Sequence, residues 1–166
     1  MTLGKGVLGI TRKHGIPLVI NDSLDIALII GADGVHLGQD DISIKDARRL
    51  SVTAGRREFI IGKSTHSLKQ AMDAQREGAD YIGVGPIFPS KVKPDYTVVG
   101  AGLIKQVEEK IRVPFFAIGG INQNNIENVL KAGARRVAVS GAVCEAEDVQ
   151  KATRRLKEKL KSTRSY

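Results

Sequence analysis

The sequence of 166 residues predicts an α/β domain built on a parallel sheet. Short apolar runs rich in valine and isoleucine recur along the chain, each closed by glycine, asparagine or serine. A longer stretch with helical spacing of its apolar residues follows most of these runs, and such alternation is typical of βα units. The predicted strands cover residues 17–20, 34–37, 59–62, 81–84, 115–118 and 136–140.

The segments between the strands indicate helices with a repeated ending. Their apolar residues recur three or four positions apart over residues 24–29, 44–50, 68–74, 103–111 and 126–130. Three of them end alike, in Gly31-Ala32-Asp33, Gly78-Ala79-Asp80 and Gly133-Ala134-Arg135. Glycine in the left-handed conformation stops a helix. A repeated turn, without the GxGxxG motif of an open dinucleotide-binding sheet, favours a TIM-type (βα)8 barrel.

The predicted barrel is incomplete. A barrel of this type closes with eight strands, and about six are visible here. The segment from Val7 to His14 is typical of the end of a helix that leads into the first visible strand. We therefore expect one incomplete barrel domain over residues 1–166, either truncated at its N-terminal side or completed by another subunit.

Composition excludes several classes of protein. Hydrophobic residues make up 42% and charged residues 27%, which is typical of a soluble globular protein. No apolar run is long enough for a membrane span, and the N-terminus lacks the pattern of a signal peptide. Cys144 is the single cysteine, so an internal disulfide is excluded and a cytoplasmic location is expected.

The net charge of +8 comes largely from the predicted C-terminal helix. Aromatic residues are only 4% and do not alternate with basic positions, so the stacking platform of a nucleic-acid binder is missing. We expect phosphorylated small molecules as partners rather than nucleic acid. The basic residues of this segment are Lys151, Arg154, Arg155, Lys157, Lys159, Lys161 and Arg164.

Two predicted loops at the carboxyl ends of strands, where such barrels place their chemistry, offer carboxylates. Asp22 follows the first predicted strand, and Asp41 lies in the loop after the second. Mg²⁺ takes oxygen ligands from one or two carboxylates and from substrate phosphates, so the pair is a predicted magnesium site. For either residue alone, capping of the following helix is the alternative.

Hydroxyl and basic groups follow the next two strands. Ser64 lies in a hydroxyl-rich loop suited to phosphate, although Ser67 in the same loop is also a good helix N-cap. The long irregular loop over residues 85–95 carries Lys91 and Lys93, whose charge suits a polyphosphate. Two lysines in a surface loop are also commonplace. The three histidines lack metal-ligand spacing, so zinc is not expected.

Glycines follow the last two predicted strands. Gly119-Gly120 and Ser140-Gly141 would let backbone N–H groups approach an anion, and loops at this place in a barrel often bind phosphate. A tight turn without a ligand is the alternative.

Motifs spread over nearly the whole chain resemble those of the thiamine phosphate synthase family. They are Ile20-Asn21-Asp22, the run from Gly34 to Asp41, Ser64-Thr65-His66, the run from Gly83 to Ser90, the run from Ala117 to Ile121, and Val137-Ala138-Val139-Ser140. The resemblance implies transfer of hydroxymethylpyrimidine from its diphosphate to the ring nitrogen of a thiazole phosphate, with release of pyrophosphate.

The resemblance also implies roles for individual residues. Asp22 and Asp41 would hold Mg²⁺, and Ser64 and Lys93 are the expected catalytic residues. The substrate-binding residues implied are Asn21, Ser64, Ser90, Lys93, Gly119, Gly120, Ser140 and Gly141. Stabilising a departing diphosphate requires cations and preorganised donors rather than a protein nucleophile.

Three departures from the family pattern keep alternatives open. The basic Gln-x-Arg-x-Lys strand of the family has no counterpart, Val92 replaces a threonine, and Ser140-Gly141 stands where the family more often has Val-Ser. A thiazole tautomerase that depends on His66 is one alternative, and a non-catalytic phosphate-binding fragment is another. A homodimer is expected by analogy.

Overall fold

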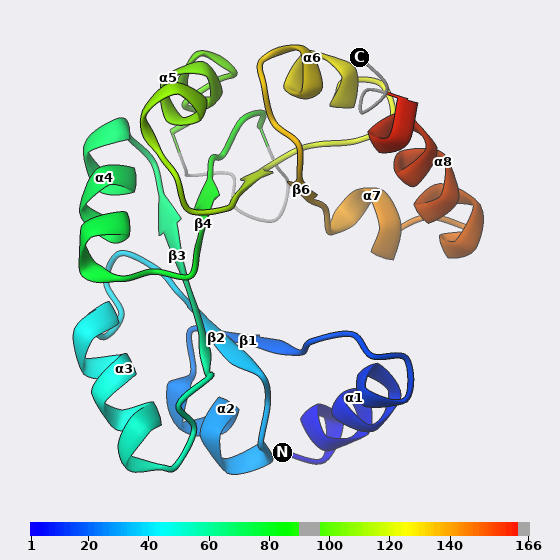
Figure 1. The fold of residues 1–166 in the computed structure, drawn as a ribbon. Helices are drawn as coiled ribbons and strands as arrows, with labels where there is room; N and C mark the ends of the chain where they lie inside the picture. The colour runs from blue at the N-terminus through cyan, green and yellow to red at the C-terminus, as the bar shows by residue number, and fades with distance from the viewer. Residues whose placement is uncertain (90–96, 163–166) are drawn as a thin grey trace.

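The computed structural model describes residues 1–89 and 97–162, which contain a curled half-barrel of parallel strands (Figure 1). Six strands pair in the order β1-β2-β3-β4-β5-β6, so each edge strand has one neighbour in this part of the chain. The strands are β1 (Val19–Asn21), β2 (Gly34–Leu37), β3 (Ile60–Thr65), β4 (Tyr81–Val84), β5 (Phe115–Ile118) and β6 (Val137–Ala138).

Helices lie between successive strands and cover the outside of the curl. In Figure 1, α2 to α6 surround the sheet, whereas α1 precedes β1, and α7 and α8 follow β6. The helices are α1 (Thr2–Lys13), α2 (Leu24–Ile30), α3 (Ile44–Thr53), α4 (Leu68–Glu77), α5 (Gly102–Lys110), α6 (Ile126–Lys131), α7 (Gly141–Cys144) and α8 (Val149–Ser162). None of the helices in the described residues combines the length and apolar character needed to cross a bilayer.

The main core lies between the sheet and these helices. Side chains alternate along a strand, so one face of each strand packs outward. Val35, Ile61 and Val84 are fully buried on that face, and they belong to the same hydrophobic cluster as the helix residues Ala47 and Val107. The opposite, inner face carries His36, Gly62, Ser64 and Tyr81, and this polar face is where strand geometry positions a site.

The repeated turn predicted from the sequence has two parts. Gly31 and Gly78 take left-handed conformations, with φ of 75° and 91°, and end α2 and α4. The aspartate two residues later accepts a backbone N–H at the preceding strand: Asp33 from Leu18, and Asp80 from Ile61, each at 2.7 Å. The third turn has arginine at this place, so its side chain cannot accept such a bond.

Candidate functional site

The two predicted metal ligands both lie close to Gly38. A Cβ added to Gly38 would be 3.2 Å from Oδ2 of Asp41 and 3.9 Å from Oδ1 of Asp22. One carboxylate follows β1 and the other follows β2, so the ends of neighbouring parallel strands place them together. The structure therefore brings together the pair that the sequence predicted.

Neither aspartate is the N-cap residue of the helix that follows it. Ser23 is the N-cap residue of α2, and Ser43 is that of α3, where its side chain accepts the N–H of Asp46. Asp41 instead accepts the N–H of Gly38 at 2.6 Å. The alternative of helix capping is therefore wrong for Asp41, and the N-cap position before α2 belongs to Ser23 rather than to Asp22.

The backbone at Asp22 is unusual and is held from β2. Asp22 has φ of 63°, a left-handed value at the one non-glycine residue with positive φ in the described residues. Aspartate tolerates this region better than most residues. The N–H of Asp22 donates to the carbonyl of His36 at 2.8 Å, which ties this loop to the neighbouring strand.

The pair fits Mg²⁺ that shares its coordination with a substrate. Two carboxylates around one glycine supply hard oxygen ligands, and Mg²⁺ commonly completes its shell with water and phosphate oxygens. Within residues 1–89 and 97–162, no group of three or more His, Cys, Asp or Glu side chains is arranged as an all-protein metal site. The donor set thus suits a metal bound together with a phosphorylated ligand.

Ser64 lies on the inner face of β3, next in the sheet to the strand that leads to Asp41. Its hydroxyl is 2.9 Å from Nε2 of His36, and its carbonyl accepts the side-chain amide of Gln39 at 2.5 Å. Gln39 neighbours Gly38, so these contacts join the predicted catalytic serine to the carboxylate-bearing loop.

Lys63 is a site residue that the sequence reasoning missed. Its ammonium group donates to the carbonyl of Gly38 at 2.6 Å, while the N–H of Gly38 donates to Asp41. The peptide groups on both sides of Gly38 are therefore held by charged side chains. The available signal was a lysine directly after the predicted strand over residues 59–62, at the strand end where such a fold places its chemistry.

The Gly119-Gly120 turn packs closely against the loop that follows β4. A Cβ on Gly119 would lie 2.5 Å from Cβ of Pro86, and one on Gly120 would lie 2.3 Å from the carbonyl oxygen of Pro89. The carbonyl of Gly119 accepts the N–H of Phe88 at 3.1 Å. Close packing alone therefore requires glycine at both positions, and the predicted phosphate contact stays a prediction.

Ser140 and Gly141 lie at the start of α7. Ser140 is the N-cap residue, and its carbonyl accepts the N–H groups of Val143 and Cys144. A Cβ on Gly141 would be 3.2 Å from Oε1 of Glu145, so a carboxylate lies beside this turn. Glu145 is exposed, so a phosphate bound here would require its carboxylate to turn away into solvent.

The other predicted residues differ in what can be said of them. Asn21 is exposed at the end of β1, where it pairs in register with His36. Ser90 and Lys93 lie outside the described residues. His66, the residue required by the tautomerase alternative, has Nδ1 at 2.5 Å from the carbonyl of Gly85, so this ring nitrogen is engaged with the backbone.

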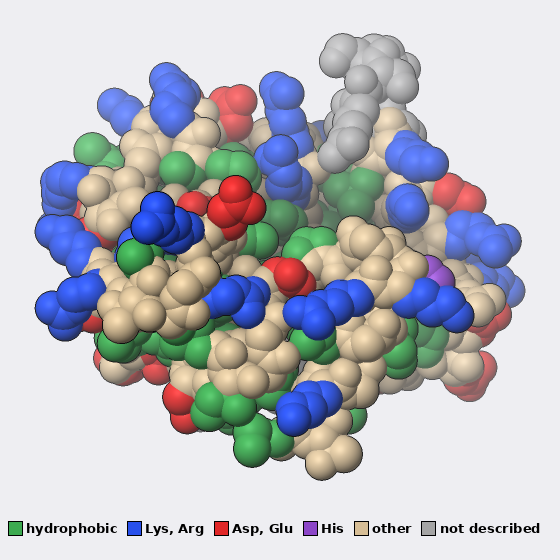
Figure 2. Space-filling model, turned by 60° about the horizontal axis from the view of Figure 1, so that its bottom comes forward, with side chains coloured by type: hydrophobic (Ala, Val, Ile, Leu, Met, Phe, Trp, Pro, Cys, Tyr) green, Lys and Arg blue, Asp and Glu red, His purple; other side chains and the backbone are tan. Residues whose placement is uncertain are grey.

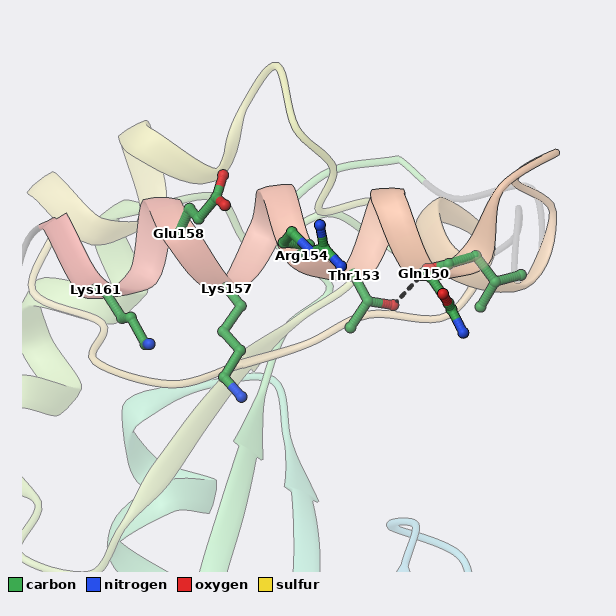
Figure 3. Close-up of a pocket in the computed structure, with 7 residues that line it drawn as sticks. Gln150, Thr153, Arg154, Lys157, Glu158 and Lys161 are labelled. Carbon is green, nitrogen blue, oxygen red and sulfur yellow. Dashed lines mark hydrogen bonds between the residues drawn. The ribbon is translucent and has the colours of Figure 1, made fainter.

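The prominent surface hollows do not coincide with this site. One hollow of about 510 Å³ runs along the surface of α8 (Figure 3). Its lining residues are Val149, Gln150, Thr153, Arg154, Lys157, Glu158 and Lys161. Another of about 300 Å³ lies at the start of β5, opposite the strand ends that carry the carboxylates. Figure 2 shows lysine and arginine side chains spread across one face of the molecule rather than gathered in one patch. Charge and hollows alone would not have located the carboxylate pair.

Comparison with known proteins assigns the chain to a family. A family model described as thiamine monophosphate synthase matches residues 1–143. The chain is 48% identical over 142 residues to a thiamine-phosphate synthase of Halalkalibacterium halodurans, covering 85% of this chain and 65% of the relative. It is 41% identical over 161 residues to the thiamine-phosphate synthase of Thermus thermophilus, covering 96% of this chain and 75% of that protein.

A solved structure supports the same grouping. The thiamine phosphate pyrophosphorylase of Pyrococcus furiosus superposes with a TM-score of 0.88 at 38% identity, covering 98% of this chain and 76% of that one. The chain thus spans about two thirds to three quarters of the length of these relatives.

Proposed function

The chain belongs to the thiamine monophosphate synthase family, and from this premise we propose that it is a thiamine phosphate synthase. The reaction breaks the C–O bond between the hydroxymethylpyrimidine and its diphosphate, and forms a C–N bond to the ring nitrogen of the thiazole phosphate. Thiamine phosphate and pyrophosphate are the products. The six strands would then be part of an eight-stranded TIM-type barrel, which their parallel order and curl support.

The carboxylate pair is the observation that carries this proposal. Asp22 and Asp41 would hold Mg²⁺ beside Gly38, and the metal, when bound, would neutralise charge on the departing diphosphate. Lys63 holds the Gly38 carbonyl, so the loop that carries Asp41 is positioned before substrate binds.

The remaining predicted residues would bind substrate. Ser64, and with it Lys93 and Ser90, would donate hydrogen bonds to the diphosphate or the pyrimidine, and Asn21 would contact the same substrate. The thiazole phosphate would be bound at the turns that contain Gly119, Gly120, Ser140 and Gly141. Preorganised donors of this kind stabilise charge that develops as the bond breaks.

Two further proposals concern the setting of the reaction. We place it in the cytoplasm, because charged phosphate esters do not enter the hydrocarbon core of a membrane. We also propose a homodimer, supported by an exposed apolar stripe on α1 whose members Leu3, Val7 and Ile10 are 81%, 37% and 65% exposed. Sedimentation of the purified chain would test the second proposal, since a monomer at micromolar concentration refutes it.

Release of pyrophosphate tests the proposed activity. The chain is incubated with both substrates and Mg²⁺, and Asp41→Asn is compared with Asp40→Asn. Asp40 is the exposed neighbour and serves as a matched loss of charge. We expect Asp41→Asn to lower turnover by at least about 100-fold, and Asp40→Asn to stay within about threefold of the unchanged chain. Equal effects of the two changes would refute the metal assignment, and phosphate binding without any release would identify a binding protein instead.

A further inference from the structure

The inner face of the half-barrel holds a row of hydrogen-bonding side chains from three neighbouring strands. Tyr81 on β4 has its hydroxyl 3.0 Å from Nδ1 of His36 on β2. The other ring nitrogen of His36, Nε2, is 2.9 Å from the hydroxyl of Ser64 on β3. The row ends at the serine that the proposed function places against substrate.

Two glycines make room for this row. A Cβ on Gly62 would lie 2.2 Å from Cζ and 2.5 Å from the hydroxyl oxygen of Tyr81. A Cβ on Gly83 would lie 3.3 Å from Cε1 of His36. Glycine inside a strand lowers stability, so its presence twice within one small region indicates close approach of side chains.

Aromatic packing fixes the tyrosine at the end of the row. Its ring packs edge-on against Phe116 of β5, with centroids 5.4 Å apart and planes at 75°. The ring of His36 lies 5.4 Å from the Tyr81 ring on another side. Packed aromatic rings hold their polar ends in place.

A direction can be assigned to the hydrogen bonds of the row. Burial raises the pKa of Tyr81 to about 12, so the phenol keeps its proton and can donate it. We assign this proton to the bond with Nδ1 of His36, the hydrogen-bond partner that the described residues offer the phenol, so that Nδ1 accepts. In a neutral imidazole the proton therefore lies on Nε2 and is donated to the Ser64 oxygen. The proton of Ser64 is left to be donated elsewhere.

We propose that Tyr81 and His36 are positioning residues that hold Ser64 as a hydrogen-bond donor toward the phosphorylated substrate. The identity of the substrate in this inference rests on the proposed function. The choice of residues rests on the contacts between β2, β3 and β4. The Gln39 side chain supports it from the other side, because it bonds the Ser64 carbonyl and so restrains the same residue.

Nitrogen-15 NMR of histidine-labelled full chain tests the direction of the bonds without any assay of activity. We expect His36 to be the Nε2–H tautomer in the unchanged chain, and we expect Tyr81→Phe to produce a mixture of tautomers. Phenylalanine keeps the ring over Gly62 and removes only the hydroxyl. An Nδ1–H tautomer in the unchanged chain overturns the proposal, and so does a tautomer that Tyr81→Phe leaves unaltered.

Turnover then tests whether Tyr81 acts through Ser64. We expect Tyr81→Phe to lower kcat by about tenfold with little change in KM for the thiazole phosphate, and Ser64→Ala to lower it by about 100-fold. The double variant should be no slower than Ser64→Ala alone, because the positioned group is already missing. Multiplied effects would overturn the proposal. If the unchanged chain releases no pyrophosphate, the proposed function fails, while the NMR result still decides the arrangement of the row.

Discussion

Replacing Gly62 by alanine is the sharpest test of how the inner face is packed. The added Cβ would lie 2.2 Å from Cζ of Tyr81, whereas carbon atoms in contact are about 3.5–4.0 Å apart. Relieving the overlap therefore requires the ring to move by more than about 1 Å. A shift of that size breaks the hydrogen bond between Tyr81 and His36, which is 3.0 Å long in the structure.

The expected cost follows from these two losses. Overpacking of this kind costs roughly 1–3 kcal/mol, and the lost hydrogen bond costs about 1 kcal/mol. Alanine also restricts the backbone of the unfolded chain more than glycine does, and this stabilises the folded state by about 0.5–1 kcal/mol. A net loss of about 1–3.5 kcal/mol should lower the melting temperature by roughly 2–14 °C for a chain of this length.

Thermal unfolding followed by circular dichroism measures the loss, with Gly9→Ala as the matched control. Gly9 lies inside α1, and an added Cβ there would meet nothing within 4 Å. That change should stabilise the chain by about 0.5–1 kcal/mol. Repeating Gly62→Ala in a Tyr81→Ala background should abolish its cost. The reasoning is refuted if Gly62→Ala melts at the temperature of the unchanged chain, or costs as much without the Tyr81 ring.

Three other outcomes follow from single contacts. Asp33→Ala leaves the N–H of Leu18 without its acceptor and should cost about 1–3 kcal/mol in urea unfolding, whereas exposed Asp25→Ala should cost less than about 0.5 kcal/mol. Ultraviolet titration should show one tyrosine ionising near pH 12, and Tyr81→Phe should remove this step. Because the folded chain holds this proton more tightly than the unfolded chain, the associated stability is present below about pH 10 and is lost as the pH rises toward 12. Lys63→Met should raise the Mg²⁺ concentration needed for half-maximal turnover by about tenfold, and Lys63→Arg should restore it, since arginine can also donate to the Gly38 carbonyl.

Much of the fold could be predicted because the apolar runs are short and sharply bounded. β2, β4 and β5 have the predicted bounds, since a glycine or a polar residue ends each run. β3 extends to Thr65, beyond its apolar run, because Lys63, Ser64 and Thr65 pair in register with Ile82, Gly83 and Val84. Pairing with β4 therefore extends β3 past the point where its apolar run ends.

The candidate site was predicted in part. Strand register explains why the carboxylates were found and the row across three strands was not. The carboxylates were found because each follows a strand end, and that place can be recognised from one strand at a time. The row of His36, Ser64 and Tyr81 joins residues from three strands, and their approach depends on pairings such as Ser64 with Gly83. A single sequence shows alternation within a strand but not the offset between strands.

The glycines near the site are required for different physical reasons, and only some of these reasons support a bound ligand. At positions 119 and 120 the loop after β4 comes so close that packing by itself excludes a side chain. Gly62 and Gly83 likewise make room for Tyr81 and His36. Gly38 differs, because the atoms nearest to its missing Cβ are carboxylate oxygens of two aspartates. Two like charges gathered around one residue repel each other, and a cation bound between them would relieve that repulsion. The case for metal-assisted chemistry therefore rests on these carboxylates, and replacing either should be more damaging to turnover than to folding.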